Sequence, residues 1–597
     1  MTINRRRFLQ ITSSVAVLGQ VWPERIFASG ASADTDFAVR AFEFSGSGMW
    51  QWKSIDRALA IMDRLGFNTL ILHQNDLPNF IVWPSAYFTT DFMFSHDPVR
   101  KSCAWNGANH LRAVTRRTAR RNIRLFLEDN EICFPDRLVE LHPELMPTKG
   151  VVCPTHPFWW EFERAKYAEV IKEIPEIAGV VVSSGTRESR VSIGAHDCTC
   201  DRCRSCAPLD WYANLIRSIH EPLKAAGKLL VVRDLADRGN EQSVIVEACA
   251  RVSPDIVVSL KNTPHDFCPV YPDNPRIGRT NGSPQWAEFD TMGQFSGMGI
   301  LPCSLVEDMQ RRLRYCRRKG VTGVWFRADV GFVSDSSVFN TLNLLNLFGA
   351  GLLSSTVERD LDEVYDAWLS HGLPDPLKTE SEQSDPVPVR PADRDRFREF
   401  MKASWSVMEK TVYVRGLAFT DGTGRFPDSI DRAFDTMLVL HRRDDWEPGA
   451  SKRVEPTEEN LKAVVEEKEQ AEREAARLPQ ILKLDQAQLP VDLRASLAAM
   501  LELYRLYVEG FRHCTVACFA TRRAMHSRNP ADLEAAGAAA DRLTIYRDRA
   551  ARLLQDTGYP HSVHRMFDLD CLDRLITDVC KKTASIRVVS APAVDRG

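Results

Sequence analysis

The 597-residue sequence lacks three features that would each indicate a class of function. No stretch approaches the roughly 20 uninterrupted apolar residues that cross a bilayer, so we expect no membrane span in the mature protein. There is no excess of positive charge, since 77 Lys and Arg stand against 80 Asp and Glu, and this argues against nucleic acid as a partner. No glycine-rich phosphate loop follows the first predicted strand, which argues against an open dinucleotide-binding sheet.

The first 33 residues have the order of regions that is typical of an export signal. The segment NRRRFLQ (residues 4–10) is followed by a short, mildly apolar run, ITSSVAVLG, and then by the small residues ASGASA. An arginine pair before Phe8 and Leu9 is typical of the twin-arginine route. We therefore expect residues 1–33 to direct export and the mature protein to be periplasmic or secreted.

From residue 37 onward, short apolar strands alternate with amphipathic helices. The expected strands are FAVRAFEF (37–44), NTLILH (68–73), IRLFLED (123–129), AGVVVSS (178–184), KLLVVRD (228–234), DIVVSLK (255–261) and VTGVWFRAD (321–329). This alternation predicts an α/β fold, a (β/α)8 TIM barrel over residues 35–375. Residues 376–395 are rich in proline and charge, as linkers are, and the helical spacing beyond them predicts an all-α domain over residues 396–585.

Charged residues gather at the carboxyl ends of the predicted strands, which meet at one face of a barrel, where active sites lie. They are Glu43, His73, Glu128, Asp129, Glu188, Arg233, Asp234, Lys261, His265, Asp266, Arg327 and Asp329. Burying so many ionisable groups is costly unless they pair with one another or face a polar ligand. One interpretation is a salt-bridge network that closes the barrel mouth. The other is a site for hydrolysis of a glycosidic bond, because that chemistry requires chiefly two carboxyl groups beside the anomeric carbon.

Four segments carry a resemblance to a known family: LLVVRDL, DIVVSLKNTPHDF, WAEFDTMGQFSGMG and FNTLNLLNLFGAGLL. They are similar, in this order, to successive barrel segments of the α-glucuronidases of glycoside hydrolase family 67. In that family a strand ending in arginine precedes one ending in lysine, a short turn and a catalytic aspartate. The resemblance covers roughly residues 37–370. It implies an enzyme that removes an acidic sugar from the end of an oligosaccharide without an organic cofactor.

The resemblance also implies roles for individual residues. Arg233 and Lys261 match the cations that meet the carboxylate of the sugar, and Asp266 matches the base that activates water. Glu188 lies where the family places its general acid. We expect desolvation to raise the pKa of Glu188, and the two cations to keep Asp266 ionised. An inverting enzyme of this type holds its two carboxyl groups about 6.5 to 9.5 Å apart.

Further substrate contacts are expected from His265, Glu288 and Gln294. Gln294 takes the position of the family's second basic carboxylate, and Glu288 lies six residues before it. An amide in this position favours an alternative, a carbohydrate-binding protein without catalysis. The presence of both Glu188 and Asp266 favours the enzyme.

A cysteine cluster follows Glu188 in the segment HDCTCDRCRSC, with Cys198, Cys200, Cys203 and Cys206 within nine residues. Four thiolates can surround Zn²⁺ tetrahedrally, so a structural zinc is one interpretation, with His196 as an alternative ligand. One or two disulfides are another interpretation in an oxidising compartment, and free thiols are a third. A metal or redox protein built on this cluster, such as an iron–sulfur enzyme, is the main alternative to a hydrolase.

Overall fold

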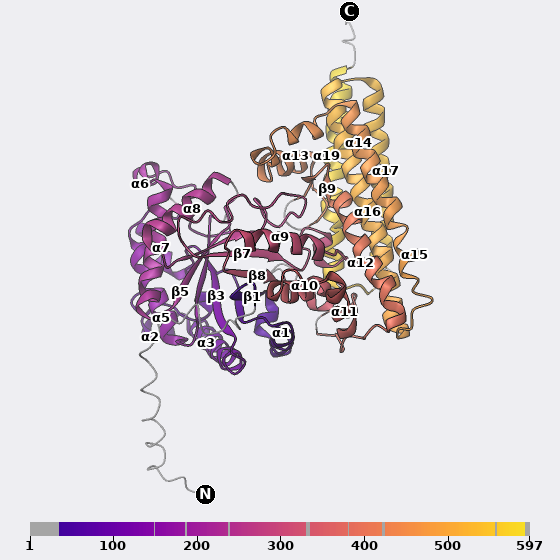
Figure 1. The fold of residues 1–597 in the computed structure, drawn as a ribbon. Coiled ribbons are helices and arrows are strands. Elements are labelled where there is room, and N and C mark those ends of the chain that lie inside the picture. The colour runs from indigo at the N-terminus through magenta and orange to yellow at the C-terminus, as the bar shows by residue number, and fades with distance from the viewer. Residues whose placement is uncertain are drawn as a thin grey trace, which may run out of the picture.

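A computed structural model describes residues 35–590, except 149, 186–187, 237–238, 330–334, 380, 421–423 and 556–557. The expected export signal lies outside these residues and stays a prediction. Figure 1 shows two parts side by side, a barrel built from the first half of the chain and a group of long helices built from the second half.

The first part is a closed barrel of eight parallel strands in chain order, in which β8 pairs with β1. The strands are β1 (Val39–Ser45), β2 (Thr69–His73), β3 (Arg124–Asn130), β4 (Gly179–Ser184), β5 (Leu229–Asp234), β6 (Val257–Lys261), β7 (Gln285–Asp290) and β8 (Gly323–Arg327). The predicted fold class is confirmed. The seven strands expected from apolar runs begin and end within two residues of the observed ones.

Both faces of the barrel strands are buried, which explains their near-continuous apolar runs. Alternate side chains point inward and form a compact inner core of Val39, Ala41, Ile71, Phe126, Val181, Val231, Val257, Trp286 and Trp325. Two residues further toward the carboxyl ends, the same strand faces carry Glu43, His73, Glu128, Arg233, Glu288 and Arg327. The two-residue period of a strand therefore directs these charged side chains toward the barrel axis as well.

Helices surround the barrel: α1 (Trp52–Leu65), α2 (Thr90–His96), α3 (Pro98–Ala119), α4 (Arg137–Leu141), α5 (Phe158–Glu173), α6 (Asp201–Ser205), α7 (Pro208–Ala225), α8 (Gly239–Val252), α9 (Val306–Arg318) and α10 (Leu344–Ser355). Between β6 and β7 the described residues 262–284 contain no helix. This long loop carries His265 and Asp266.

The last helix of the first part, α11 (Leu361–His371), packs on α10. The second part is helical, as predicted: α12 (Pro391–Val412), α13 (Ile430–Asp435), α14 (Glu458–Ala475), α15 (Leu478–Leu482), α16 (Val491–Ser527), α17 (Pro530–Gln555), α18 (His561–Phe567) and α19 (Leu569–Ser590), with a small hairpin of β9 (Tyr413–Val414) and β10 (Leu417–Ala418). The long helices α12, α14, α16, α17 and α19 pack against one another (Figure 1). In the described part of the chain, no helix is long and apolar enough to cross a membrane.

Candidate active site at the barrel mouth

The centre of the barrel mouth holds a buried ionic network. Arg233, which is 1% exposed, donates from Nη1 to Glu128 Oε1 at 2.6 Å and from Nε to Glu288 Oε2 at 2.9 Å. Its Nη2 also donates to Glu288, so the guanidinium holds that carboxylate with a two-pronged fork. Ser183 Oγ donates to Glu128 at 2.7 Å. Both glutamates are fully buried.

The other half of the network joins Glu43, His73 and Arg327. His73 Nδ1 lies 2.9 Å from Glu43 Oε1 and 3.9 Å from Glu128 Oε2, and Arg327 Nε lies 3.4 Å from Glu43 Oε1. Burial opposes charge on His73, but Glu128 and Glu43 outweigh it and raise the pKa of His73. Burial likewise opposes charge on Glu43, but Arg327, His73 and Arg233 lower the pKa of Glu43 to about 2. The salt-bridge network that was one of the two interpretations is thus present at the centre of the barrel mouth.

The network limits what two of the predicted substrate contacts can do. Arg233 uses three of its five N–H donors on Glu128 and Glu288, and it is almost fully buried, so a sugar carboxylate reaches it only by entering this buried, paired site. Glu288 is fully buried and held by that arginine. Among the predicted cations, Lys261 is the one near the surface of the mouth, with a side chain that is 12% exposed.

Lys261 and Asp266 form a pair above the network. Lys261 Nζ donates to Asp266 Oδ1 at 2.6 Å, and the aspartate side chain is 29% exposed, so solvent and ligands can reach it. Burial would raise the pKa of Asp266, but Lys261, His265 and His441 outweigh it and hold the pKa well below its usual range. Asp266 is therefore ionised at neutral pH, which suits the expected base.

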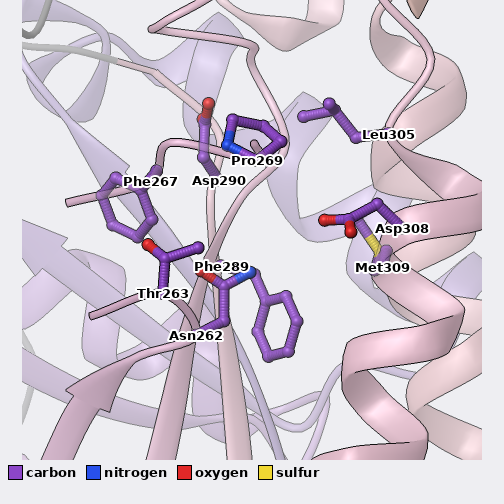
Figure 2. A pocket seen from close by; sticks show the side chains of 9 residues that line it. All are labelled: Asn262, Thr263, Phe267, Pro269, Phe289, Asp290, Leu305, Asp308 and Met309. Carbon is purple, nitrogen blue, oxygen red and sulfur yellow. The ribbon is translucent and has the colours of Figure 1, made fainter. Parts of the chain in front are cut away.

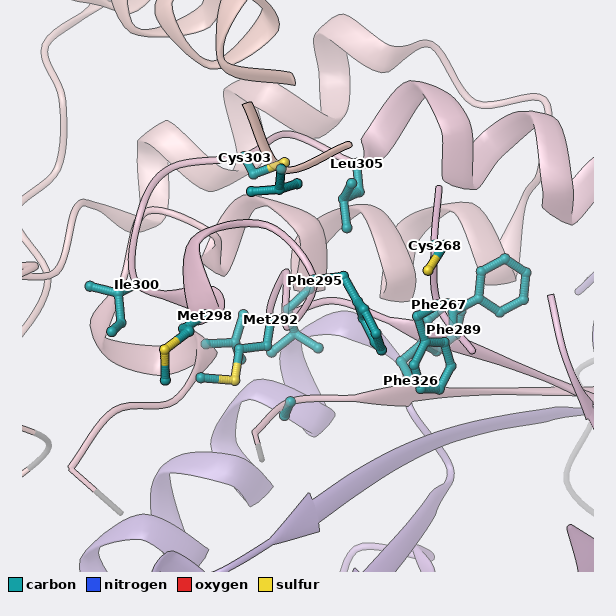
Figure 3. Close-up of a cluster of buried hydrophobic side chains, with 14 of the residues drawn as sticks. Phe267, Cys268, Phe289, Met292, Phe295, Met298, Ile300, Cys303, Leu305 and Phe326 are labelled. Atoms are coloured by element: carbon teal, nitrogen blue, oxygen red, sulfur yellow. The ribbon is translucent and has the colours of Figure 1, made fainter. Parts of the chain in front are cut away.

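The turn that presents Asp266 is rigidly supported. Asp266 has a left-handed φ of 49°, a conformation that aspartate tolerates better than most residues, and the next side chain, Phe267, is buried. Phe267 packs in an apolar cluster with Phe289, Phe295 and Phe326 (Figure 3). Lys261 Nζ lies 5.2 Å from the centre of the Phe267 ring. Apolar packing thus fixes both members of the pair.

A small cavity lies behind this turn (Figure 2). Its volume is about 20 Å³, and its lining residues are Asn262, Thr263, Phe267, Pro269, Phe289, Asp290, Leu305, Asp308 and Met309. Such a space holds about one water molecule and is far too small for a sugar. A larger groove of about 760 Å³ lies on the outside of the barrel, between α1 and residues 371–386, away from the strand ends.

Gln294 lies at the edge of the network, on the loop after β7. Asp290 fixes this loop by accepting from the backbone N–H groups of Met292, Gly293 and Gln294 at 2.8 to 3.0 Å. Arg327 Nη1 then donates to Gln294 Oε1 at 3.2 Å. Gln294 therefore lies beside the charged groups, with a neutral amide facing an arginine.

Glu188 lies on the loop after β4 and is exposed, and its Oε2 accepts from Asn75 Nδ2 at 3.3 Å. The desolvation expected of Glu188 is therefore wrong, because its side chain is exposed. Nearby, sequence reasoning missed Glu131, a fully buried carboxyl directly after β3. Burial raises the pKa of Glu131 to about 8, and its Oε1 accepts from the Gly185 N–H at 2.7 Å. Its place at a strand end was the available signal.

His265 meets a residue of the helical part. Its ring centre lies 4.3 Å from that of His441, and Tyr271 Oη donates to the His441 carbonyl at 2.6 Å. Burial, followed by the neighbouring His265, lowers the pKa of His441 to about 3. His441 was not predicted as a site residue either, because nothing in the sequence links it to a loop about 175 residues earlier.

The cysteine cluster differs from the predicted set in one member. Cys198, Cys200 and Cys203 converge with Cys153, and all four sulfurs lie within 4.8 Å of one another. Cys206 and His196 lie outside this group, and the Cys206 thiol faces the Ala207 carbonyl at 3.7 Å. The group of four close sulfurs therefore contains Cys153 and not the predicted Cys206. Spacing rules consider only neighbouring cysteines, whereas folding brings in one from 45 residues earlier.

A second group, Glu43, His73 and Glu128, also has ligand atoms within 4.8 Å of one another. Arg327 and Arg233 already supply positive charge to its carboxylates. Adding a cation there would bring like charges together, so the cysteine group is the better metal site.

No protein-family model and no curated protein matches this chain. Among solved structures, the chain is similar to a GH138 enzyme targeting pectin rhamnogalacturonan II, with a TM-score of 0.62 and 11% identity over 94% of this chain and 85% of that one. It is more remotely similar to an O-GlcNAc hydrolase of Thermobaculum terrenum, with a TM-score of 0.40 and 10% identity over 93% of this chain and 96% of that one. The similarity to the GH138 enzyme supports the fold, a (β/α)8 barrel continued by C-terminal helices.

Proposed function

We propose that this protein is a glycoside hydrolase that removes an acidic sugar from an oligosaccharide at the barrel mouth. The observation that carries the proposal is the Lys261–Asp266 pair, an ionised and solvent-reachable carboxylate joined to a cation at the carboxyl end of β6. The chain also shares its fold, over most of its length, with an enzyme that targets pectin rhamnogalacturonan II.

In the proposed reaction, Asp266 removes a proton from the attacking water, and Glu188 protonates the leaving oxygen. The ammonium of Lys261 attracts the sugar carboxylate as a point charge. Glu188 is exposed and accepts from Asn75, so its carboxyl group can be reached by a substrate. For inversion, we expect about 6.5 to 9.5 Å between the two carboxyl groups in the complex.

A second candidate is a carbohydrate-binding protein without catalysis. It is favoured by the pairing of Glu128 and Glu288 with Arg233, which removes two strand-end carboxylates from chemistry. It is also favoured by the neutral Gln294 beside Arg327.

Product analysis distinguishes the candidates. The mature protein is incubated with oligosaccharides from rhamnogalacturonan II, with glucuronate-bearing oligosaccharides and with neutral ones, beside its Asp266→Asn and Glu188→Gln variants. Matched controls are Asp255→Asn and Glu358→Gln, which change carboxylates of surface ion pairs. We expect release of one acidic sugar that both site variants reduce at least about 100-fold, in line with the loss of a general acid or base.

Two other outcomes would contradict the assigned roles or the hydrolase proposal. Release that persists in both site variants would move the reaction to other carboxyl groups, with Glu131, Glu128, Glu288 and Asp329 next to be changed. Binding of an acidic oligosaccharide without release would support the binding protein.

A further inference from the structure

We propose that Cys153, Cys198, Cys200 and Cys203 form a structural zinc site that joins two loops of the barrel. The Cys153 sulfur lies 3.6 Å from that of Cys200 and 3.5 Å from that of Cys203. A tetrahedral zinc with Zn–S bonds of about 2.3 Å separates its sulfurs by about 3.8 Å. The two Cys153 distances are within a few tenths of an ångström of this spacing, and all four sulfurs lie within 4.8 Å of one another.

Contacts that do not involve sulfur fix the position of Cys153. Its N–H donates to the Leu145 carbonyl at 2.8 Å, and its own carbonyl accepts from Trp159 Nε1 at 2.8 Å. Trp211 Nε1 donates to the adjacent Pro154 carbonyl at 2.8 Å. Both tryptophans are fully buried. The fourth thiol is thus held in place by the fold, as a preorganised metal ligand should be.

The other three thiols come from the loop between β4 and α7, around the short helix α6. Cys198 and Cys203 are 5% and 8% exposed, and Cys153 is fully buried. The Thr155 hydroxyl lies 3.2 Å from the Cys203 sulfur and 3.3 Å from the Cys153 sulfur, where it can donate to thiolates. A set of four mutually close, mostly buried sulfurs suits a tetrahedral ion better than a disulfide, which joins only two of them.

The two loops also meet outside the cysteines. Ile132 and Val191 form a bridge between them, and Arg190 Nη1 donates to the Phe134 carbonyl at 3.0 Å. Glu188 lies between β4 and these contacts, ten residues before Cys198. A zinc ion would therefore fix the loop that presents Glu188. This positioning role, unlike the metal site itself, rests on the proposed function.

The test measures metal and thiols in the full-length protein purified without chelator. We expect one zinc per chain by elemental mass spectrometry, and at least a tenfold lower zinc content in Cys153→Ser after dialysis against EDTA. The matched control is Cys206→Ser, which changes a cysteine of the same sequence cluster outside the four-sulfur group. We expect it to keep the wild-type zinc content.

Three results would overturn the proposal. The first is a wild-type protein that contains no zinc and whose four cysteines react with an alkylating reagent or form disulfides. The second is iron in place of zinc, and the third is zinc that is lost in Cys206→Ser and kept in Cys153→Ser. If Cys153→Ser does not fold, cobalt exchanged into the wild-type and Cys206→Ser proteins decides. Thiolate-to-cobalt charge-transfer bands of equal strength in the two proteins would support the four-cysteine site. Bands that are absent from the wild-type protein, or that are lost in Cys206→Ser, would contradict the proposal. Because these measurements use no substrate, they stand apart from any failure of the hydrolase proposal.

Discussion

At the scale of single residues, Lys261 sets the charge of Asp266, and this gives a test by pH. Lys261→Met removes the strongest opposing charge at 2.6 Å, so the pKa of Asp266 should rise. A general base becomes protonated and inactive as the pH falls through its pKa. The acidic limb of the kcat/KM profile should therefore move to higher pH by about 1 to 3 units. Lys224→Met, which breaks an exposed pair with Asp255, should leave the limb in place. A limb that stays fixed in Lys261→Met means that Asp266 is not the titrating base.

Arg233 is expected to matter for stability. Arg233→Met leaves Glu128 and Glu288 buried without their cation, and breaking a buried pair in this way costs about 3 to 5 kcal/mol. The thermal midpoint and the denaturant midpoint, followed by tryptophan fluorescence, should both fall clearly. Arg314→Met is the control, because its pair with Glu358 is exposed and screened by solvent, and the midpoints should hardly change. Equal small shifts in both variants would show that the network adds little to stability.

The charged residues of the mouth were largely predictable one by one, but their pairing was not. Strand periodicity places Glu43, Glu128 and Arg233 at inward positions near strand ends. Which carboxylate meets which cation depends on the stagger between neighbouring strands, such as the register that sets Lys261 beside Glu288. The sequence does not state that register, so both a salt-bridge network and a ligand site remained possible interpretations.

At the scale of elements, the start of α10 holds the loop between β7 and α9. Asn343 Nδ2 donates to the carbonyls of Met292 and Leu301 at 2.8 and 3.1 Å, and its Oδ1 accepts from the Cys303 N–H at 2.8 Å. Asn343→Leu leaves these buried backbone groups unpaired, at about 1 to 3 kcal/mol each. We expect faster amide hydrogen exchange in residues 291–305 by mass spectrometry. Asn109→Leu, at an exposed position of α3, should leave that exchange unchanged. Unchanged exchange in Asn343→Leu would mean that other contacts hold the loop.

Elements were predictable where their residues carry a local pattern. The buried strands are apolar runs between amphipathic helices, and seven of them were found in this way. The strand β7 begins at Gln285, carries Glu288 in its middle and follows a loop without a helix, so only the family resemblance indicated it. Cys153 carries no local pattern at all, because its partners approach through the packing of two separate loops.

At the scale of the whole molecule, the helical part completes the mouth of the barrel. His441 packs on His265, and Arg443 Nη1 donates to the Val270 carbonyl at 3.0 Å. On the loop after β7, the Ser304 N–H donates to Ser404 Oγ of α12 at 2.9 Å. The loop that carries Asp266 is therefore supported from both parts, and the two parts should behave as one unit.

That unity can be tested by cutting the chain without removing any of it. A protease site inserted between Ser384 and Asp385, both exposed, allows cleavage of the folded protein before α12 begins. We expect the two fragments to elute together in size-exclusion chromatography at the position of the uncut protein, with nearly the same thermal midpoint, because the buried contacts between the parts lie on either side of the cut. The uncut insertion variant is the control for the added residues. Separate elution of the fragments in native buffer would show that the barrel stands without the helices, and the support of the Asp266 loop by His441 would then be incidental.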